Sequence, residues 1–128
     1  MPIIESTQFG IAIGLSLQGY TVLNLYPRMN FMLSAIDPLI NFLDKIEEIS
    51  HKEYSSKMII RTAIGSQKPL FPGHQHIFDY TEGIKSMCHN IQVVKLQEPQ
   101  EIFPAYYNAY FSKKPTLIVE YADYYTSK

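Results

Sequence analysis

The sequence contains a single cysteine, no tryptophan and no long uninterrupted apolar run. Because Cys88 has no second cysteine to pair with, no internal disulfide can form, and we expect a reduced, cytoplasmic setting. Glycine and polar residues interrupt the stretch "FGIAIGLSLQGYTVLNL", which therefore does not predict a membrane span. The net charge of −1 gives no electrostatic reason to expect nucleic acid or an anionic membrane surface as a partner.

Hydrophobic residues make up 46% and charged residues 18% of the 128 residues, which predicts one folded domain over residues 1–128. Ten tyrosines and seven phenylalanines supply the aromatic content, and many of them lie between residues 106 and 125. That much aromatic surface near one end predicts burial, either in the core or against a partner chain.

Apolar spacing predicts strands and helices in alternation along the chain. Short apolar runs indicate strands at residues 21–26, 57–64, 91–96 and 116–121. Helical spacing or composition indicates helices at residues 5–18, 31–48, 79–88 and 98–111. This order predicts an α/β fold, a three-layer αβα arrangement with a mainly parallel sheet covered on both faces.

Glycine and proline mark particular points in this pattern. Gly19 is expected to end the first helix, and Gly10 and Gly14, four residues apart, are expected to let another element pack closely against it. Pro38 falls inside the second predicted helix. Either Asp37 caps a fresh start with Pro38 at its first position, or the helix kinks there.

Few side chains could carry chemistry. In a parallel sheet ligands lie at the carboxyl ends of the strands, and the loop at residues 65–76 follows a strand at that end. The sequence has neither a glycine-rich phosphate loop nor a set of zinc ligands. The groups that remain are Glu5, Arg28, Arg61, His74, His76, Asp79 and Glu82.

Several segments in order resemble one enzyme family. "PIIES" and the following "FGIAIGLSLQG" resemble the P-I-x-E segment and small-residue helix of thiamine-diphosphate-dependent 2-oxoacid dehydrogenase beta subunits. The likeness continues through "NFMLSAIDPLIN", "IIRTAIG", "PGHQH" and "EPQEIFPAYYNAYFSKKPTLIVEYADYY". The resemblance implies a transketolase-like pyrimidine-binding domain.

The resemblance also implies roles for three side chains. Glu5 matches the glutamate that hydrogen-bonds the cofactor's aminopyrimidine ring and so helps remove the proton of the thiazolium carbon. His76 matches the histidine that reaches the reacting end of the cofactor. Tyr26 falls where the family has an aromatic residue near the pyrimidine. Without the resemblance, Glu5 would be interpreted as a solvated first-turn residue and His76 as an ordinary loop histidine.

The resemblance further implies a partner. In this family an alpha-type subunit holds the diphosphate and Mg²⁺, and this sequence has no matching motif. Family members have an additional region before P-I-x-E and a C-terminal domain after "VEY", so the resemblance implies that residues 1–128 form a pyrimidine-binding domain that is incomplete at its N-terminal side and without the C-terminal domain. Some relatives bind potassium where Ser112 and Lys114 stand, and because Lys114 would repel a cation we expect no metal site in this chain.

Three functions remain open from the sequence. The first is the pyrimidine-binding half of a thiamine-diphosphate enzyme that acts on a 2-oxo acid within a homo- or hetero-oligomer. The second is a noncatalytic truncated subunit or assembly module. The third, an unrelated small-molecule binder, is supported only by the long loop at residues 65–76.

Overall fold

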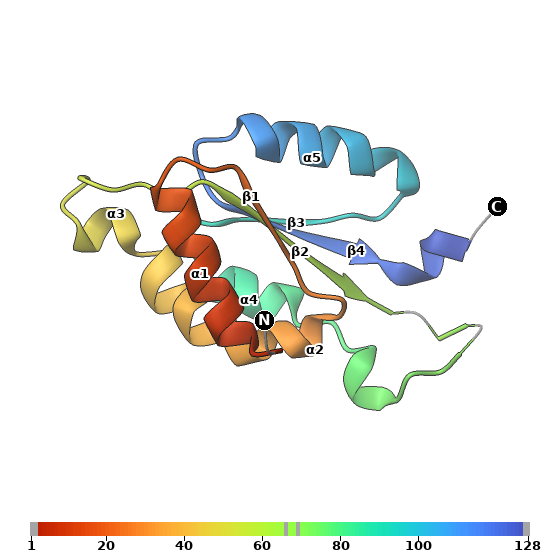
Figure 1. The fold of residues 1–128 in the computed structure, drawn as a ribbon. Helices are drawn as coiled ribbons and strands as arrows, with labels where there is room; N and C mark the ends of the chain where they lie inside the picture. The colour runs from red at the N-terminus through yellow and green to blue at the C-terminus, as the bar shows by residue number, and fades with distance from the viewer. Residues whose placement is uncertain (1–2, 66, 69, 127–128) are drawn as a thin grey trace.

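A four-stranded, all-parallel sheet forms the centre of the structure, a computed structural model that describes residues 3–65, 67–68 and 70–126 (Figure 1). The strands are β1 (Val22–Leu25), β2 (Met58–Ile64), β3 (Gln92–Lys95) and β4 (Thr116–Tyr121). The helices are α1 (Glu5–Leu17), α2 (Met29–Met32), α3 (Ile46–Ile49), α4 (Thr81–Met87) and α5 (Ile102–Phe111). Shorter 3-10 turns lie at Leu33–Ala35, His74–His76, Pro99–Glu101 and Ala122–Thr126.

The strand order across the sheet is β1-β2-β4-β3. Val22 of β1 pairs with Met58 of β2, and Thr116 of β4 pairs with both Ile59 of β2 and Gln92 of β3. All three pairings are parallel, which confirms the predicted α/β class. The loop after β2 and the segment after β4 therefore leave the sheet from the same end, the end to which the arrowheads point in Figure 1.

Helices cover one face of the sheet more fully than the other. On the first face, shared by α1, α2 and α4, β2 contributes Met58, Ile60 and Ile64, each at most 2% exposed. On the second face, Ile59 and Ile118 pack against Ala109 of α5. This alternation follows from the period of two along a strand, and it makes β2 a strand buried on both sides.

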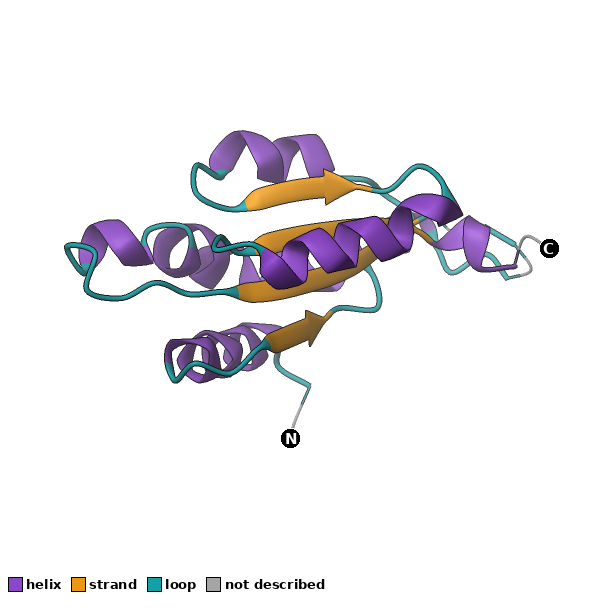
Figure 2. Cartoon of the chain, turned by 90° about the horizontal axis from the view of Figure 1, so that it is seen from above, coloured by secondary structure: helices purple, strands orange, loops and turns teal. Residues whose placement is uncertain are grey.

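The second face is left partly uncovered at β1. Figure 2 shows α5 lying over the two central strands rather than over the edge strand. Leu23 and Leu25 of β1 point to this face and are 51% and 50% exposed. The prediction of a sheet covered on both faces is therefore confirmed for the face that carries α1 and only partly for the face that carries α5.

The aromatic residues near the end of the chain are mostly exposed, so their interpretation as core residues is wrong. Phe103, Tyr107 and Phe111 form a stripe along the outer side of α5, with exposed fractions of 76%, 54% and 63%. Neighbouring rings in this stripe lie 6.0 and 4.8 Å apart between centroids. Spacing by four residues places these side chains on the side of α5 away from the sheet, where they pack on one another and on Tyr110.

Pro38 lies inside a continuous run of helical backbone. Asp37 has helical angles, φ −60° and ψ −58°, and its side chain does not cap the turn, so a fresh start capped by Asp37 is ruled out. The backbone instead widens into a π-helical turn over Pro38–Leu43. Because proline cannot donate a backbone hydrogen bond and crowds the preceding turn, a wider turn accommodates the ring without breaking the helix.

Gly10 and Gly14 do not mediate close packing in this chain, contrary to the prediction. Both are exposed, and a Cβ atom added at either position would meet no other atom within 4 Å. Gly19, by contrast, ends α1 with φ +86°, the left-handed conformation predicted for it.

Substituting Gly14 and Gly19 by alanine should change the free energy of unfolding in opposite directions. Gly14→Ala is expected to raise the free energy of unfolding by about 0.5–1 kcal/mol, because alanine loses less conformational entropy in a helix. Gly19→Ala is expected to lower it by about 1 kcal/mol, since a Cβ strains a left-handed residue. Urea denaturation of the two variants measures both changes, and stabilisation by Gly19→Ala would contradict the account.

Candidate functional site

A cavity of about 250 Å³ lies at the carboxyl end of β1. Its lining comes from the start of α1, the end of β1 and the short helix α2, and consists of Ile3, Glu5, Gln8, Leu25, Tyr26, Pro27 and Phe31. Among the described residues of this lining, Glu5 is the only charged one. A mostly apolar cavity with a carboxylate at the carboxyl end of a parallel sheet suits a ligand with an aromatic ring and a polar edge.

Glu5 opens α1 and is half-buried. Ile4 precedes it in extended conformation and supplies no side-chain cap, so Glu5 is the acidic residue of an otherwise uncapped helix start. Within the described part of the chain, no donor bonds to the Glu5 carboxylate. The side chain is therefore free to accept a hydrogen bond from a group placed in the cavity.

A network of hydrogen bonds connects the residues around the cavity. Gln8 Nε2 donates to Asn24 Oδ1 at 2.6 Å and to the Leu25 carbonyl at 3.1 Å. Asn24 Nδ2 donates to the Tyr26 hydroxyl at 3.1 Å, and this hydroxyl donates to the backbone carbonyl of Glu5 at 3.1 Å. This hydrogen-bond network connects the first turn of α1 to β1 and so positions Glu5.

Tyr26 is nearly inaccessible, at 1% exposed. Its ring stacks on Phe9 with centroids 6.4 Å apart, beneath the cavity. Burial raises the pKa of Tyr26 to about 12; the hydrogen bond from Asn24 opposes this and the nearby Glu5 charge adds to it. Tyr26 therefore contributes to the cavity lining as a neutral phenol, and stacking of its ring on a pyrimidine stays a prediction.

His76 lies next to the cavity lining through Phe31. The two rings have centroids 5.3 Å apart, tilted by 34°. Nδ1 of His76 lies 3.0 Å from Oδ1 of Asn30, and Arg28 donates to the carbonyls of Gly65 and His76 at 3.0 and 3.4 Å. The helix α2 and its first flanking residue thus hold the base of the loop after β2 and bring His76 and Glu5 to the same corner of the sheet.

The remaining candidates from the sequence lie elsewhere. His74 is exposed and packs edge-on against Phe71 at 5.1 Å between centroids. Arg61 pairs with Glu120 on the α5 face, away from the cavity. Asp79 pairs with Lys95 at 2.6 Å, and the Asp79 pKa is lowered because this lysine and Thr81 outweigh the effect of burial.

The sequence did not predict the residues that position Glu5 and His76. Gln8, Asn24 and Asn30 bond across distances of 16 to 46 residues along the chain, which no local pattern reveals. One signal was present: Asn24 is a polar residue inside a predicted strand, on the face that the alternation assigns to the core, so it required a hydrogen-bond partner.

A larger depression, of about 560 Å³, opens before β3 and is lined by Glu47, Glu48, His51, Lys52 and Asn90. Its lining is polar and it lies at the opposite end of the sheet from Glu5 and His76. Among residues 3–65, 67–68 and 70–126, no group of three or more histidine, cysteine or acidic side chains could hold a metal ion. No helix in that part of the chain is long and apolar enough to cross a membrane.

No family model matches the chain, and no curated protein is significantly similar to it. The assignment of the cavity therefore depends on its geometry together with the resemblance of individual segments.

Proposed function

We propose that this chain is the pyrimidine-binding half of a thiamine-diphosphate-dependent enzyme that acts on a 2-oxo acid. In this proposal it forms a transketolase-like pyrimidine-binding domain and functions in the cytoplasm in an oligomer with an alpha-type subunit. The observation that carries the proposal is Glu5, a carboxylate that lines an apolar cavity at the carboxyl end of a parallel sheet and accepts no hydrogen bond from the residues that the structure describes.

The lining of the cavity fits one part of the cofactor and not the other. An aminopyrimidine is a flat ring with polar nitrogens, and the apolar walls with the Glu5 carboxylate suit it. None of the seven described lining residues is cationic, and so they would not hold a diphosphate. This division supports a partner subunit that supplies the diphosphate and Mg²⁺ site.

The two proposed catalytic residues would do different things. Thiamine diphosphate, when bound, supplies an electron sink for the carbon that loses carbon dioxide. Glu5 would hydrogen-bond a ring nitrogen of the pyrimidine and stabilise one protonation state of that ring. His76 would orient the substrate carboxylate or exchange a proton near it, because its ring borders Phe31 in the cavity wall.

Binding of the pyrimidine half alone tests the proposal. We expect 4-amino-5-hydroxymethyl-2-methylpyrimidine to bind weakly, with a dissociation constant near ~1 mM for so small a ligand. In an NMR titration the resonances of Gln8, Leu25 and Phe31 should shift. Glu5→Gln is expected to weaken binding at least ~10-fold, since it removes a hydrogen bond to a charged group.

A matched control separates this effect from a general change at a helix start. Glu82 occupies the first turn of α4 as Glu5 occupies the first turn of α1, but it is exposed and lies outside the cavity. Glu82→Gln should therefore leave the dissociation constant unchanged. Equal binding by wild type and Glu5→Gln would remove Glu5 from the proposed mechanism.

The exposed apolar surface favours a second function, that of a noncatalytic assembly module. Leu23, Leu25 and the aromatic stripe Phe103, Tyr107 and Phe111 offer apolar surface that a partner could cover. An assembly module would bind an alpha-type subunit in sedimentation experiments with equal affinity for wild type and Glu5→Gln, and the mixture would not decarboxylate 2-oxo acids.

A further inference from the structure

We infer that Asn30 is a positioning residue that holds His76 in one tautomer, with the proton on Nδ1 and the lone pair on Nε2. The role of His76 in proton exchange rests on the proposed function, whereas the tautomer itself does not. The juxtaposition is direct: Oδ1 of Asn30 lies 3.0 Å from Nδ1 of His76.

Three contacts from one short segment immobilise His76. Asn30 meets the edge of the ring, Phe31 meets its face at 5.3 Å between centroids, and Arg28 donates to its backbone carbonyl at 3.4 Å. The His76 amide also donates to the Gly73 carbonyl at 3.1 Å, which closes the 3-10 turn. These contacts fix both the ring and the backbone of His76. What they leave to be determined is which ring nitrogen carries the proton.

The acceptor at Nδ1 decides that location. An amide oxygen only accepts hydrogen bonds, so Oδ1 of Asn30 requires a proton on Nδ1 of the ring. In neutral histidine the other nitrogen is then unprotonated. No described residue bonds to Nε2, so Nε2 remains available as a proton acceptor.

This arrangement has a consequence for the site. A histidine whose Nε2 carries a lone pair accepts a proton or a hydrogen bond first and donates only after it has been protonated. Phe31 lies between His76 and the cavity that contains Glu5, so α2 joins the two proposed catalytic residues through one rigid turn. Asn30 would therefore act on the chemistry through His76 without touching the substrate.

Nitrogen NMR of the full-length ¹⁵N-labelled chain tests the inference without any ligand. At about pH 8.5 histidine side chains are neutral, and protonated and unprotonated ring nitrogens resonate at well-separated positions. We expect His76 to show a protonated Nδ1 and an unprotonated Nε2, with its signals assigned by their loss in His76→Gln. A protonated Nε2, as would follow if Nδ2 of Asn30 donated to the ring, would overturn the inference.

Variants of Asn30 extend the test. Asn30→Leu removes the acceptor and is expected to shift His76 toward the Nε2-protonated form, whereas Asn30→Asp keeps an acceptor and should retain the wild-type tautomer. Asn41 is exposed and its side chain donates to Asp37, so Asn41→Leu serves as the matched control and should leave the His76 signals in place. An unchanged tautomer in folded Asn30→Leu would contradict a positioning role.

The two proposals can fail separately. If the tautomer follows Asn30 but Glu5→Gln binds the aminopyrimidine as wild type does, the positioning role stands and the proposed function fails. If Glu5→Gln weakens binding but His76 keeps its tautomer in Asn30→Leu, the proposed function stands and the positioning role fails.

Discussion

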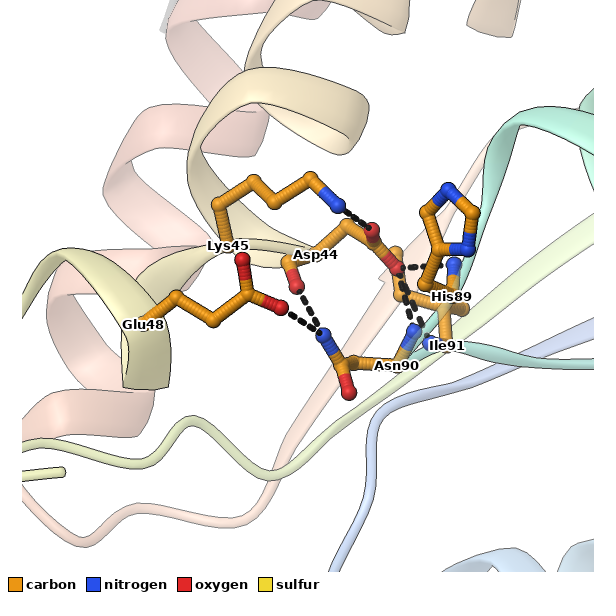
Figure 3. A network of polar contacts seen from close by, with 6 residues as sticks. All are labelled: Asp44, Lys45, Glu48, His89, Asn90 and Ile91. Carbon is orange, nitrogen blue, oxygen red and sulfur yellow. Dashed lines mark hydrogen bonds and ion pairs between the residues drawn. The ribbon is translucent and has the colours of Figure 1, made fainter.

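Asp44→Ala is expected to lower the free energy of unfolding by about 3–5 kcal/mol, because it removes a buried carboxylate that accepts hydrogen bonds from three backbone donors. Oδ1 of Asp44 accepts the backbone N–H groups of His89, Asn90 and Ile91 at 2.9, 2.7 and 3.1 Å (Figure 3). Oδ2 lies 3.1 Å from Nζ of Lys45. Asp44 is 1% exposed, so water would not readily replace these bonds.

The network joins segments that are far apart in sequence. Asp44 follows the π-helical turn Pro38–Leu43, and its three backbone partners lie in the turn that leads into β3. A single carboxylate therefore fixes the helical region on the first face of the sheet to the entry of an edge strand. Its loss should loosen β3 as well as remove hydrogen bonds, which places the expected effect among the largest for a single substitution.

Urea denaturation of three proteins measures the effect. Asp44→Asn keeps one acceptor oxygen but loses the charge, so it should cost less than Asp44→Ala, about 1.5–3 kcal/mol. Asp37→Ala is the control, since Asp37 lies on the same helical segment, is exposed and accepts a hydrogen bond from Asn41. That control should change stability by less than about 0.5 kcal/mol. Similar losses for Asp44→Ala and Asp37→Ala would refute a special role for Asp44.

The same carboxylate predicts a dependence of stability on pH. Burial alone would raise the pKa of Asp44, but the donors from Asn90, Lys45, His89 and Ile91 outweigh it, so the pKa lies below the usual value of 3.8. The unfolded chain consequently binds a proton at a higher pH than the folded chain. The stabilisation is complete above pH ~4 and is lost as the pH falls through the lowered pKa. The difference in free energy of unfolding between wild type and Asp44→Asn should therefore become smaller below pH ~4.

The order of elements could be predicted from the sequence because it depends on local patterns. The run at residues 57–64 became β2 over Met58–Ile64, and the run at residues 116–121 became β4 with the same bounds. Short runs rich in isoleucine and valine have few alternatives to a buried strand. Parallel pairing then followed from the alternation with helices, since parallel neighbours need a crossover connection.

The coverage of the sheet could not be predicted in the same way. The spacing of apolar residues predicted α5 but not which strands it would lie over, because tertiary packing decides that. Ala105 and Ala109 bring α5 close to the central strands, and the larger aromatic side chains were left on its outer side. Leu23 and Leu25 are apolar by sequence and exposed by position, a combination that only the structure reveals.

The candidate site likewise contains residues that the sequence predicted and residues that only the structure reveals. Glu5, Tyr26 and His76 were identified by resemblance of short segments, and the structure brings all three to the carboxyl ends of β1 and β2. Their catalytic and cofactor-binding roles stay predictions. Gln8 and Asn30, which hydrogen-bond to residues 16 and 46 positions away along the chain, carried no local pattern that could have predicted these contacts.

Arg61→Met is expected to lower the free energy of unfolding by about 3–5 kcal/mol, because it leaves a buried carboxylate without its cation. Glu120 is 7% exposed and accepts from Nε and Nη2 of Arg61 at 2.9 and 2.5 Å. The hydroxyls of Tyr106 and Tyr125 donate to the same carboxylate. The cluster ties α5 and the segment after β4 to the two central strands, on the face where α5 contributes few apolar contacts.

The pKa values in this cluster supply a sharper test than the loss of stability alone. Burial would raise the pKa of Glu120, but Arg61 and the two tyrosines outweigh it and hold this pKa below 4.5. Without Arg61 the pKa of Glu120 should rise, so the folded variant would take up a proton before the unfolded chain does. The deficit of Arg61→Met should therefore shrink as the pH is lowered toward 4, whereas the deficit of a variant that only lost packing would not.

A second substitution, at Glu120, distinguishes the contribution of the ion pair from the separate contributions of Arg61 and Glu120. In Arg61→Met with Glu120→Leu the cluster no longer holds a buried charge, and Tyr106 and Tyr125 are not fully buried residues, so the double variant should be more stable than Arg61→Met alone. If the two losses simply add, Arg61 and Glu120 contribute separately and the buried-charge argument fails. An acid inside the apolar strand "TLIVEY" was the sequence's sign of this cluster, because a carboxylate with apolar neighbours on both sides requires a cation nearby.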